Sequence, residues 1–351
     1  MSNLLMLDSG AFSVWTLGAE IDLDHYIEFC QEHPGASYYV CLDKIPGKPG
    51  TNVRRTPSLL KEAAQETWNN YQRMIKYLPI EKVIPVYHRG EPLEWLQKYL
   101  DFGTPYIGFG QTGNGSMQQQ KMYLDTIEPY ILDSDRQLKV KTHGFAVTSF
   151  QLMARLPWHS VDSASWIKQA SYGMAYIPYL DREGNWDYSR APLVINFSPK
   201  SPQKREKNKH IDNLSTGIRN QVMRYLEEID MPLGEYKIVP SDKKTKDELW
   251  YEKGKSVIQK VKDGCCTNHN RRFQMNARYF REANKVLPVD HIYLAGGEGS
   301  VDERLEYKLK TRLMSYHKVG HNGTGKTKAE KSFNKWCTLT DEECNHNGSK
   351  D

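Results

Sequence analysis

The sequence predicts an α/β fold of the TIM-like (β/α)8 barrel type with a basic helical C-terminal extension. Short apolar runs alternate with helix-compatible stretches through the first half of the chain, and polar residues end the apolar runs. The length of 351 residues exceeds the roughly 250 residues that one such barrel needs. We expect the main part of the barrel in 1–195, a basic helical region that completes it in 196–319, and a flexible tail in 320–351.

Each predicted strand is a short apolar run, and each predicted helix is a longer polar, helix-compatible stretch. Strand followed by helix, repeated, is typical of parallel strands joined by crossovers. The predicted strands are Leu4–Asp8, Tyr38–Asp43, Lys82–His88, Tyr106–Gly110, Lys139–Gly144 and Ser160–Asp162. The predicted helices are Leu23–Glu32, Leu59–Lys76, Pro92–Tyr99 and Met117–Ile127.

Polar residues or glycines lie at or just after the C-terminal end of every predicted strand. They are Asp8, Asp43, His88, Gly110 with Gln111, His143 and Asp162. In a parallel barrel these strand ends gather at one face and build the active site. Because loops begin where strands end, the same pattern also has a purely structural explanation.

The alternation weakens in the second half of the chain. Ser198–His210 is predicted to be a basic loop, whereas Asn213–Glu228, Lys243–Lys262 and Arg271–Val286 are helix-compatible. His291–Gly297 is a short apolar run that predicts a strand. This strand belongs either to the barrel or to the extension.

Positive charge is concentrated in runs, although the net charge is only +5. Lys200–His210 carries five Lys or Arg and one Glu, and Lys308–Lys331 carries seven and one. Such runs fit a polyanion-binding surface, and each one alone also fits a solvated surface or a flexible tail. The candidate nucleic-acid contacts are Lys204, Arg205, Arg271, Arg272 and Arg278.

Composition and pattern also bear on the compartment. No apolar run approaches the roughly 18 residues of a membrane span, and Met1–Leu7 lacks the basic leader of a signal peptide. The 6 cysteines are sparse for a disulfide scaffold. These observations predict a protein of the reducing cytoplasm without a membrane segment, and they leave its oligomeric state open.

Two aspartates suit exchange of a base at a glycosidic bond. That reaction needs one carboxylate to attack the anomeric carbon and another to manage the protons of the leaving and arriving bases. Asp8 and Asp162 each end a predicted strand among small residues, which leave space for a flat ligand. Taken alone, an aspartate at a strand end is also a common helix N-cap.

Six short motifs follow one another along the first half of the chain. They are Leu7-Asp8-Ser9-Gly10-Ala11-Phe12, Leu42-Asp43, Ile84-Pro85-Val86-Tyr87-His88-Arg89-Gly90, Tyr106-Ile107-Gly108-Phe109-Gly110, His143-Gly144-Phe145-Ala146-Val147-Thr148-Ser149 and Ser160-Val161-Asp162-Ser163. Their order and spacing resemble the tRNA-guanine transglycosylases. The likeness covers about residues 4–170 and is greater to the phage branch that inserts 7-deazaguanines into DNA, with Trp166 as a further shared residue.

The resemblance implies a glycosyltransferase that exchanges guanine in DNA for a 7-deazaguanine base, preQ0 or a derivative, through a covalent glycosyl–aspartate intermediate. It assigns Asp162 as the nucleophile, Asp8 as the general acid/base, and Asp43 as the carboxylate that reads the donors of guanine. The other base-binding residues that it implies are Ser9, Gly10, His88, Gly108, Gly110 and His143. His88 falls near the family's base-reading Gln. His143 takes the place of a stacking residue, with a satisfied core histidine as the alternative.

The family's structural zinc is bound by Cys-X-Cys-X2-Cys and a distant His, a spacing that this sequence lacks. Weak alternative ligands for a zinc ion are Cys265, His269, Cys337 and Cys344. The zinc subdomain helps the family to hold tRNA. Because this sequence lacks the zinc-binding spacing, we expect the partners to be DNA and the free 7-deazaguanine base. The exchange requires no cofactor, since the glycosidic bond energy is conserved. For a phage-encoded chain the expected compartment is the host cytoplasm.

Three other functions are alternatives. A tRNA-guanine transglycosylase would use the same chemistry on tRNA. A base-excising glycosylase would release guanine without an incoming base and leave abasic sites. A binding protein without activity would retain only the barrel. In the DNA hypothesis the target nucleotide must be flipped out, because the duplex hides its glycosidic bond.

Overall fold

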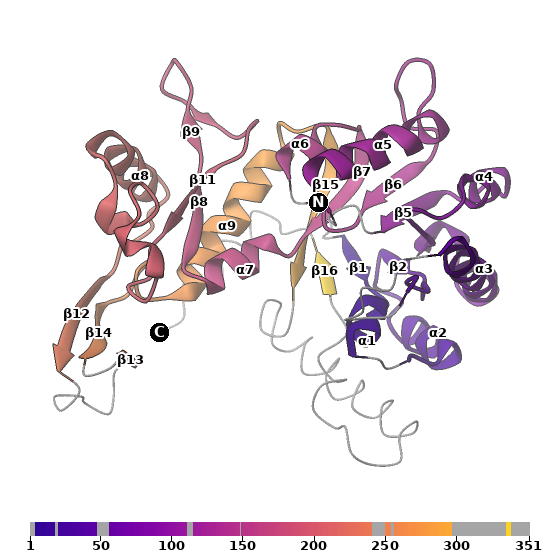
Figure 1. Ribbon diagram of the computed structural model, residues 1–351, viewed down its shortest axis with the longest axis horizontal. Helices are drawn as coiled ribbons and strands as arrows, with labels where there is room; N and C mark the ends of the chain where they lie inside the picture. Colours follow the sequence, from indigo (N-terminus) through magenta and orange to yellow (C-terminus); the bar gives the residue numbers. More distant parts are fainter. Residues whose placement is uncertain are drawn as a thin grey trace, which may run out of the picture. The chain divides into compact units, whose positions relative to one another are not determined.

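The computed structural model of this chain is a mixed α/β structure (Figure 1), which confirms the α/β part of the predicted fold class. It describes residues 4–17, 20–47, 56–110, 115–147, 149–240, 250–253, 256–296 and 335–337. The described residues separate into two compact units. The first is drawn from Met1–Ala164 and Pro288–Thr340, and the second from Ser165–Leu287.

The first unit alternates strands and helices, as the apolar and polar stretches predict. Its strands are β1 (Leu5–Leu7), β2 (Tyr38–Val40), β3 (Val83–Ile84), β4 (Val86–His88), β5 (Tyr106–Gly110), β6 (Lys141–Gly144), β7 (Trp158–Ser163), β15 (Val289–Gly296) and β16 (Lys335–Cys337). Its helices are α1 (Ala11–Leu17), α2 (Leu23–Glu32), α3 (Pro57–Met74), the 3-10 turn η1 (Ile80–Lys82), α4 (Leu93–Asp101), α5 (Met117–Ile131) and α6 (Phe150–Met153). The short helices α1 and α6 were not predicted.

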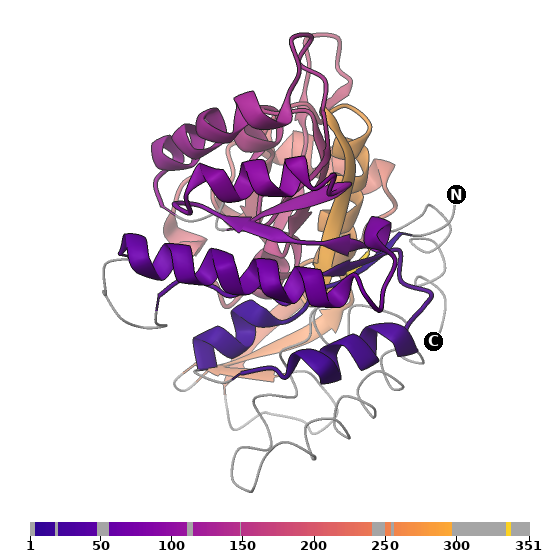
Figure 2. The same cartoon turned by 90° about the vertical axis from the view of Figure 1, so that its right-hand side faces the viewer.

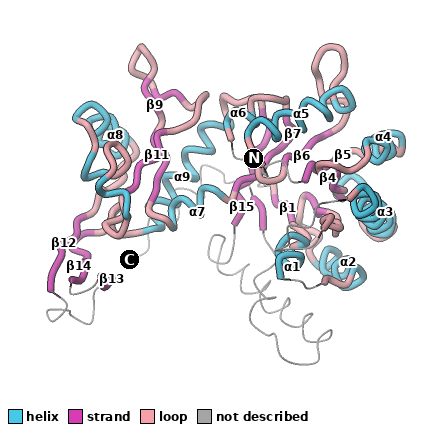
Figure 3. Tube along the Cα trace, viewed as in Figure 1, coloured by secondary structure: helices cyan, strands magenta, loops and turns pink. Residues whose placement is uncertain are grey.

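Side-chain caps define where the longer helices begin. Asp22 caps α2, Thr56 caps α3, and Ser116 with Gln119 forms a capping box at α5. These side chains satisfy N–H groups that lack a partner within the first helical turn. Figure 2 shows α2, α3, α4 and α5 side by side on the outer side of the strands, and Figure 3 shows the same alternation of strand and helix along the trace.

The strands of the first unit pair in the order β3-β2-β1-β16-β15-β7-β6-β5-β4. β16 runs antiparallel to both of its neighbours, and the other pairings are parallel. The strands at the two ends of this order, β3 and β4, are consecutive in the chain and are separated only by Pro85. Pro85 has no N–H to donate, but its carbonyl accepts from Gly108 N at 2.8 Å.

β15 pairs in parallel with β7, with Val289 opposite Trp158 and Tyr293 opposite Asp162. The strand predicted over His291–Gly297 therefore belongs to the sheet of the first unit and not to the second unit.

Alternate residues of these strands form one buried face. Its apolar members are Met6, Val40, Ile84, Val86, Tyr106 and Tyr293. Side chains alternate along a strand with a period of two. Asp8 follows Met6 by two positions, and His88 follows Val86 by two, so both share this face. Ser160 is hydrogen-bonded to Tyr106 on it, and Asp162 comes two residues later.

The second unit combines helices with small antiparallel sheets. Its elements are α7 (Ser165–Ser171), β8 (Met174–Ile177), β9 (Tyr179–Leu180), β10 (Trp186–Asp187), β11 (Leu193–Asn196), the 3-10 turns η2 (Pro202–Arg205) and η3 (Ile211–Asn213), α8 (Thr216–Glu228), β12 (Glu235–Pro240), β13 (Trp250–Lys253), β14 (Ser256–Lys262) and α9 (His269–Asn284). Its core contains Ala175, Ile177, Ile195, Phe197, Val222, Tyr225, Leu226, Cys265, Cys266 and Met275. The predicted helices over 213–228 and 271–286 correspond to α8 and α9.

The helix expected over Lys243–Lys262 is wrong where the structure describes it. Strands β13 and β14 lie there and form an antiparallel sheet with β12. β-Branched Val257, Ile258 and Val261 favour extended backbone, and this preference outweighs the helix-compatible lysines. Residues 241–249 lie outside the described part of the chain.

The structure also bears on the predicted boundaries of the barrel, at residue 195, and of the tail, at residue 320. Residues 165–195, expected within the barrel, fall in the second unit. The predicted tail over 320–351 lies outside the described residues except for β16, and the basic run 308–331 lies wholly outside them. Within the described parts, no helix combines the length and apolar character needed to cross a membrane.

Candidate active site

Asp162 lies near the end of β7 and is only 1% exposed. One of its carboxylate oxygens accepts a short hydrogen bond from Ala146 N. The other, Oδ2, has no hydrogen-bond partner among the described residues. Burial raises the pKa of Asp162 well above its ordinary value, and the negative charge of Asp8 adds to this effect, while the bond from Ala146 opposes it. Asp162 is therefore a buried carboxyl group with one unused oxygen.

The turn after β6 delivers the N–H that Asp162 accepts. Ala146 has φ +56°, a left-handed conformation that costs a non-glycine residue about 1 kcal/mol. Gly144 allows this turn to pack closely, because a Cβ there would lie 2.6 Å from Val147 Cγ2. Backbone held in such a conformation is found where the surrounding structure fixes a functional group.

Asp8 directly follows β1 and is half-buried. Buried Ser9 accepts a hydrogen bond from Ala11 N at 3.3 Å through its Oγ, and Gly10 has φ +74°. These two residues turn the chain sharply into α1, which leaves the Asp8 carboxylate at the strand end. Because the charge of Asp8 contributes to the raised pKa of Asp162, the two carboxylates lie within electrostatic reach of each other.

Ser160, two residues before Asp162, connects two other predicted strands. Its Oγ is 2.5 Å from His143 Nδ1 and 2.5 Å from Tyr106 Oη, and the three residues are fully buried. Burial, together with the charge of His159, lowers the pKa of His143 to about 3, so its imidazole is neutral. The His143 ring meets Phe145 edge-on at 4.4 Å between centroids. This environment favours a core histidine over one that stacks on a base.

Asp43, His88 and Glu91 form a second buried group. His88 Nε2 lies 2.8 Å from Asp43 Oδ2, and His88 Nδ1 lies 3.1 Å from Glu91 Oε1. The other Glu91 oxygen accepts from His88 N at 3.0 Å. Burial alone would lower the pKa of His88, but hydrogen bonds to the two carboxylates, and their charges, raise it to about 10. His88 is thus an imidazolium whose two ring N–H groups are both donated to carboxylates.

Gly108 and Gly110, predicted to let the backbone approach a base, make room for side chains of this face. A Cβ on Gly108 would lie 2.5 Å from Phe145 Cε2, and one on Gly110 would lie 2.6 Å from His88 Cδ2. Both positions therefore need glycine for close packing, whether or not a base also approaches them.

The predicted nucleic-acid contacts differ in their surroundings. Arg272 is 6% exposed, and its guanidinium donates to the carbonyls of Ala170 and Cys265, so it holds the second unit together from within. Arg271 pairs with Asp263 at 2.9 Å. Lys204 lies 3.2 Å from Asp212 and 2.6 Å from Tyr236 Oη, Arg278 is half-buried, and Arg205 is exposed. Arg205 thus has the surroundings that a phosphate contact requires.

The predicted zinc ligands are only partly described. Cys265 and Cys266 are buried free thiols, and burial raises the pKa of each to about 12, which disfavours the thiolate that binds metal. His269 begins α9, with its ring beside Phe273. The Cys337 side chain and all of Cys344 lie outside the described residues. Among those described, no three or more His, Cys, Asp or Glu side chains are placed so that they could hold one metal ion.

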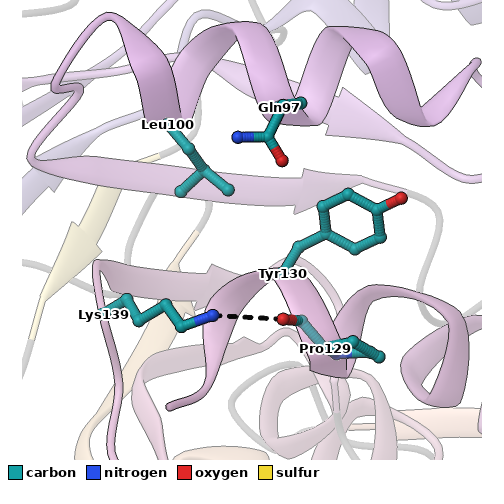
Figure 4. A pocket seen from close by; sticks show the side chains of 5 residues that line it. All are labelled: Gln97, Leu100, Pro129, Tyr130 and Lys139. Atoms are coloured by element: carbon teal, nitrogen blue, oxygen red, sulfur yellow. Dashed lines mark hydrogen bonds between the residues drawn. The ribbon is translucent and has the colours of Figure 1, made fainter.

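Among the cavities that the described residues form, two lie at the surface of the first unit. One, of about 530 Å³, lies between α4 and α5 and is lined by Gln97, Leu100, Pro129, Tyr130 and Lys139 (Figure 4). Lys139 Nζ donates to the Pro129 carbonyl there at 3.2 Å. The other, of about 580 Å³, lies between the loop after β4 and α5, with Arg89 and Glu91 in its lining. The first cavity contains none of the predicted site residues.

Several residues of the site were not predicted. Glu91, Ser160 and Ala146 each bond to a predicted residue, and Tyr106 bonds to Ser160. Two of them had a signal in the sequence. Ser160 shares a strand face with Asp162 by the period of two, and His88-Arg89-Gly90-Glu91 is a turn sequence, in which Gly90 has φ +96° and Glu91 N donates to the His88 carbonyl at 3.1 Å.

The site therefore contains two buried groups, one around Asp162 and one around His88. Known proteins give no independent guide to their role: a scan against protein-family models finds no match for this chain, and neither does a search of the curated proteins.

Proposed function

We propose that the first unit is a base-exchanging transglycosylase that acts on guanine in DNA, with Asp162 as the nucleophile and Asp8 as the general acid/base. The observation that carries this proposal is the unused Oδ2 of buried Asp162, within electrostatic reach of a second carboxylate. Two carboxyl groups whose environments differ are the usual means of dividing nucleophile and acid/base roles at a sugar.

Closure of the sheet into a (β/α)8-type barrel is part of the proposal. β3 and β4 lie at the two ends of the strand order and flank Pro85, so they can be counted as one interrupted strand. The order then contains eight strands, each with two neighbours. A barrel of this kind brings the ends of β1, β4 and β7, and with them Asp8, His88 and Asp162, around one opening. Antiparallel β16 departs from the all-parallel arrangement of that fold.

The chemistry balances without a cofactor. Asp162 must be ionised to attack, so the proton that its raised pKa favours first passes to Asp8. Asp162 Oδ2 then attacks C1′ of the flipped nucleotide, and the bond from C1′ to guanine N9 breaks as its electron pair moves to the base, which takes that proton from Asp8. The incoming 7-deazaguanine then loses the proton of its five-membered-ring nitrogen to Asp8. That nitrogen attacks C1′ and releases the Asp162 carboxylate. Two displacements retain the configuration of the sugar.

Basic residues of the second unit support a nucleic-acid substrate. Arg205, Lys207, Lys209, Lys237 and Lys262 are exposed. Lysine and arginine on a surface bind phosphates without reading sequence, and such binding weakens steeply as salt rises. We expect the second unit to hold the DNA backbone while the first performs the exchange.

The test is exchange of labelled guanine, and of labelled preQ0, into DNA and into tRNA, with Asp162→Asn as the variant and exposed Asp101→Asn as its matched control. We expect incorporation into DNA, loss of at least about a thousandfold for Asp162→Asn, and no change for the control. A wild-type rate for Asp162→Asn would refute the nucleophile.

Three outcomes distinguish the alternatives. Incorporation into tRNA alone would replace the substrate, and guanine release without an incoming base would indicate a base-excising glycosylase. DNA binding without exchange or release of a base would indicate a nucleic-acid-binding protein without catalytic activity. Mass spectrometry of the protein after acid quenching should detect the sugar ester on the peptide that contains Asp162.

A further inference from the structure

His88 and Glu91 are joined by two hydrogen bonds, which use groups that a bound base would otherwise need. Glu91 uses both oxygens on His88, at 3.1 Å to Nδ1 and 3.0 Å to the backbone N. His88 then has only Nε2 left, and this atom is directed at Asp43 Oδ2 at 2.8 Å. The side chains of His88 and Glu91 are 3% and 1% exposed. His88 has no N–H left for a ligand, and burial keeps a ligand away from the Glu91 carboxylate.

The backbone on either side of Asp43 is anchored as firmly as its carboxylate. Asn70 Nδ2 of α3 donates to the Leu42 carbonyl at 2.8 Å, and Lys44 N donates to Thr67 Oγ1 at 2.9 Å. Asp43 is therefore held through both neighbouring peptides and through one carboxylate oxygen. Its side chain is 9% exposed, so it is nearly buried but can still be reached.

We propose that Glu91 and His88 are positioning residues that lock the orientation of Asp43, so that the remaining acceptor capacity of Asp43 selects a purine edge with two adjacent N–H donors. A carboxylate has about four acceptor directions, and His88 occupies one of them. A 2-amino-6-oxopurine, or its 7-deaza analogue, supplies the ring N–H and the exocyclic amine that fit the others. The inference rests on the proposed function, because Asp43 is assigned to the base there.

The experiment replaces Glu91 by glutamine, which keeps the shape but has one acceptor oxygen in place of two. Exposed Glu94→Gln, on the adjoining helix α4, is the matched control for loss of a nearby charge. The readouts are kcat and KM for the free base with guanine and with hypoxanthine, which lacks the exocyclic amine.

For Glu91→Gln we expect KM for guanine to rise about tenfold, kcat to change little, and the preference for guanine over hypoxanthine to fall by about the same factor. A misplaced Asp43 loses its bond to the exocyclic amine, which hypoxanthine never makes. Glu94→Gln should behave as wild type. Because the preference is a ratio, partial unfolding of the variant cannot alter it.

Gly110→Ala provides an independent variant. Its new Cβ would push the His88 ring, 2.6 Å away, without removing a charge, and it should lower the same preference. If both variants keep the wild-type preference while wild-type protein exchanges guanine, the inference is overturned and the proposed function stands. If wild-type protein neither binds nor exchanges a purine, both are overturned.

Discussion

Asp43 and Asp162 are two carboxylates of the same unit with opposite surroundings. Asp43 accepts from an imidazolium that a second carboxylate holds in place. Asp162 accepts from one backbone N–H and keeps Oδ2 without a partner among the described residues. A carboxylate bound by a fixed cation is suited to hold a position. One with an unused oxygen in a low-dielectric environment is suited to react. In the proposed function, this difference separates the carboxylate that recognises the base from the one that performs the chemistry.

The two arrangements also differ in what they cost the fold. A buried polar atom left without a hydrogen bond destabilises a protein by about 1–3 kcal/mol. Around His88 that cost is offset by charge-assisted hydrogen bonds. Around Asp162 the hydrogen bond from Ala146 N offsets only part of the cost, because Oδ2 has no partner among the described residues, and the left-handed backbone of Ala146 adds to it. Stability sacrificed at a reactive group is a common feature of active sites.

Removing the cation should have the largest effect. His88→Ala leaves Asp43 and Glu91 buried without their shared partner, and loss of one member of a buried ion pair costs about 3–5 kcal/mol. Urea unfolding measures this. Half-exposed His25→Ala, which removes a histidine whose Nδ1 lies 3.7 Å from exposed Asp22, is the control and should cost under about 1 kcal/mol. A small loss for His88→Ala would mean that the buried charges are not coupled.

The same group predicts a pH dependence. The pKa of His88 is raised from 6.5 to about 10, so the folded state holds its proton more tightly than the unfolded state. The stabilisation is complete below about pH 6.5 and is lost as pH rises toward 10. In Glu91→Gln the fall in unfolding free energy over this window should be shallower, and an unchanged slope would contradict the assignment.

Gly108→Ala tests the packing near Asp162. The new Cβ would meet Phe145 Cε2 at 2.5 Å and Ile84 Cγ2 at 3.3 Å, and overpacking of this kind costs about 1–3 kcal/mol. Gly35→Ala, where a Cβ would meet nothing within 4 Å, is the matched control. Thermal melts of the two variants give the comparison, and equal melting temperatures would show that Phe145 moves aside freely.

Asp162→Asn should lower the free energy of unfolding only slightly. As pH rises, the variant should become more stable than the wild-type protein. The raised pKa of Asp162, caused first by burial, means that the folded state prefers the protonated acid. Stability due to Asp162 is therefore present below the ordinary carboxylate range and is lost as pH rises through the folded pKa. The asparagine variant has no such loss. Denaturation of both proteins from about pH 4 to pH 8 should give diverging curves, whereas parallel curves would contradict a raised pKa.

The smallest effect is expected for Ala146→Gly. Relief of the left-handed strain, worth about 1 kcal/mol, is nearly cancelled by the larger backbone entropy of glycine in the unfolded chain. The net change should be within about 0.5 kcal/mol. Ala63→Gly, in the middle of α3, gains no such relief and should cost about 1 kcal/mol. A loss at Ala146 as large as that at Ala63 would mean that its turn is unstrained.

Much of the first unit could be predicted because its strands are short, apolar and regularly spaced. The period of two carries Asp8, His88 and Asp162 to one face, and this follows from the sequence alone. The bonds between side chains do not. Nothing local predicts that both nitrogens of His88 are bound to carboxylates, since Asp43 comes from a distant segment.

The second unit was harder to predict, because basic residues there have several roles. Arg272 looks like a surface cation in the sequence, yet it is buried and bonds to two backbone carbonyls. Lysines around β13 and β14 resemble a helix surface, although β-branched neighbours make strands. Runs of charged residues say little about backbone conformation, whereas the period of apolar residues predicts it. The second unit contains more charged runs than the first.

The point at which the second unit enters the chain has a consequence for how such proteins diversify. β7 ends at Ser163, and β15 begins beside the opposite end of β7, at Trp158. Parallel neighbours require a connection that returns along the strand. Residues 165–287 form this connection in the chain, whereas the (β/α)8 repeat that we propose for the first unit has a single helix there. A recombination event at this one crossover could exchange the whole inserted module for another, leaving the strands that carry Asp8, His88 and Asp162 unaltered.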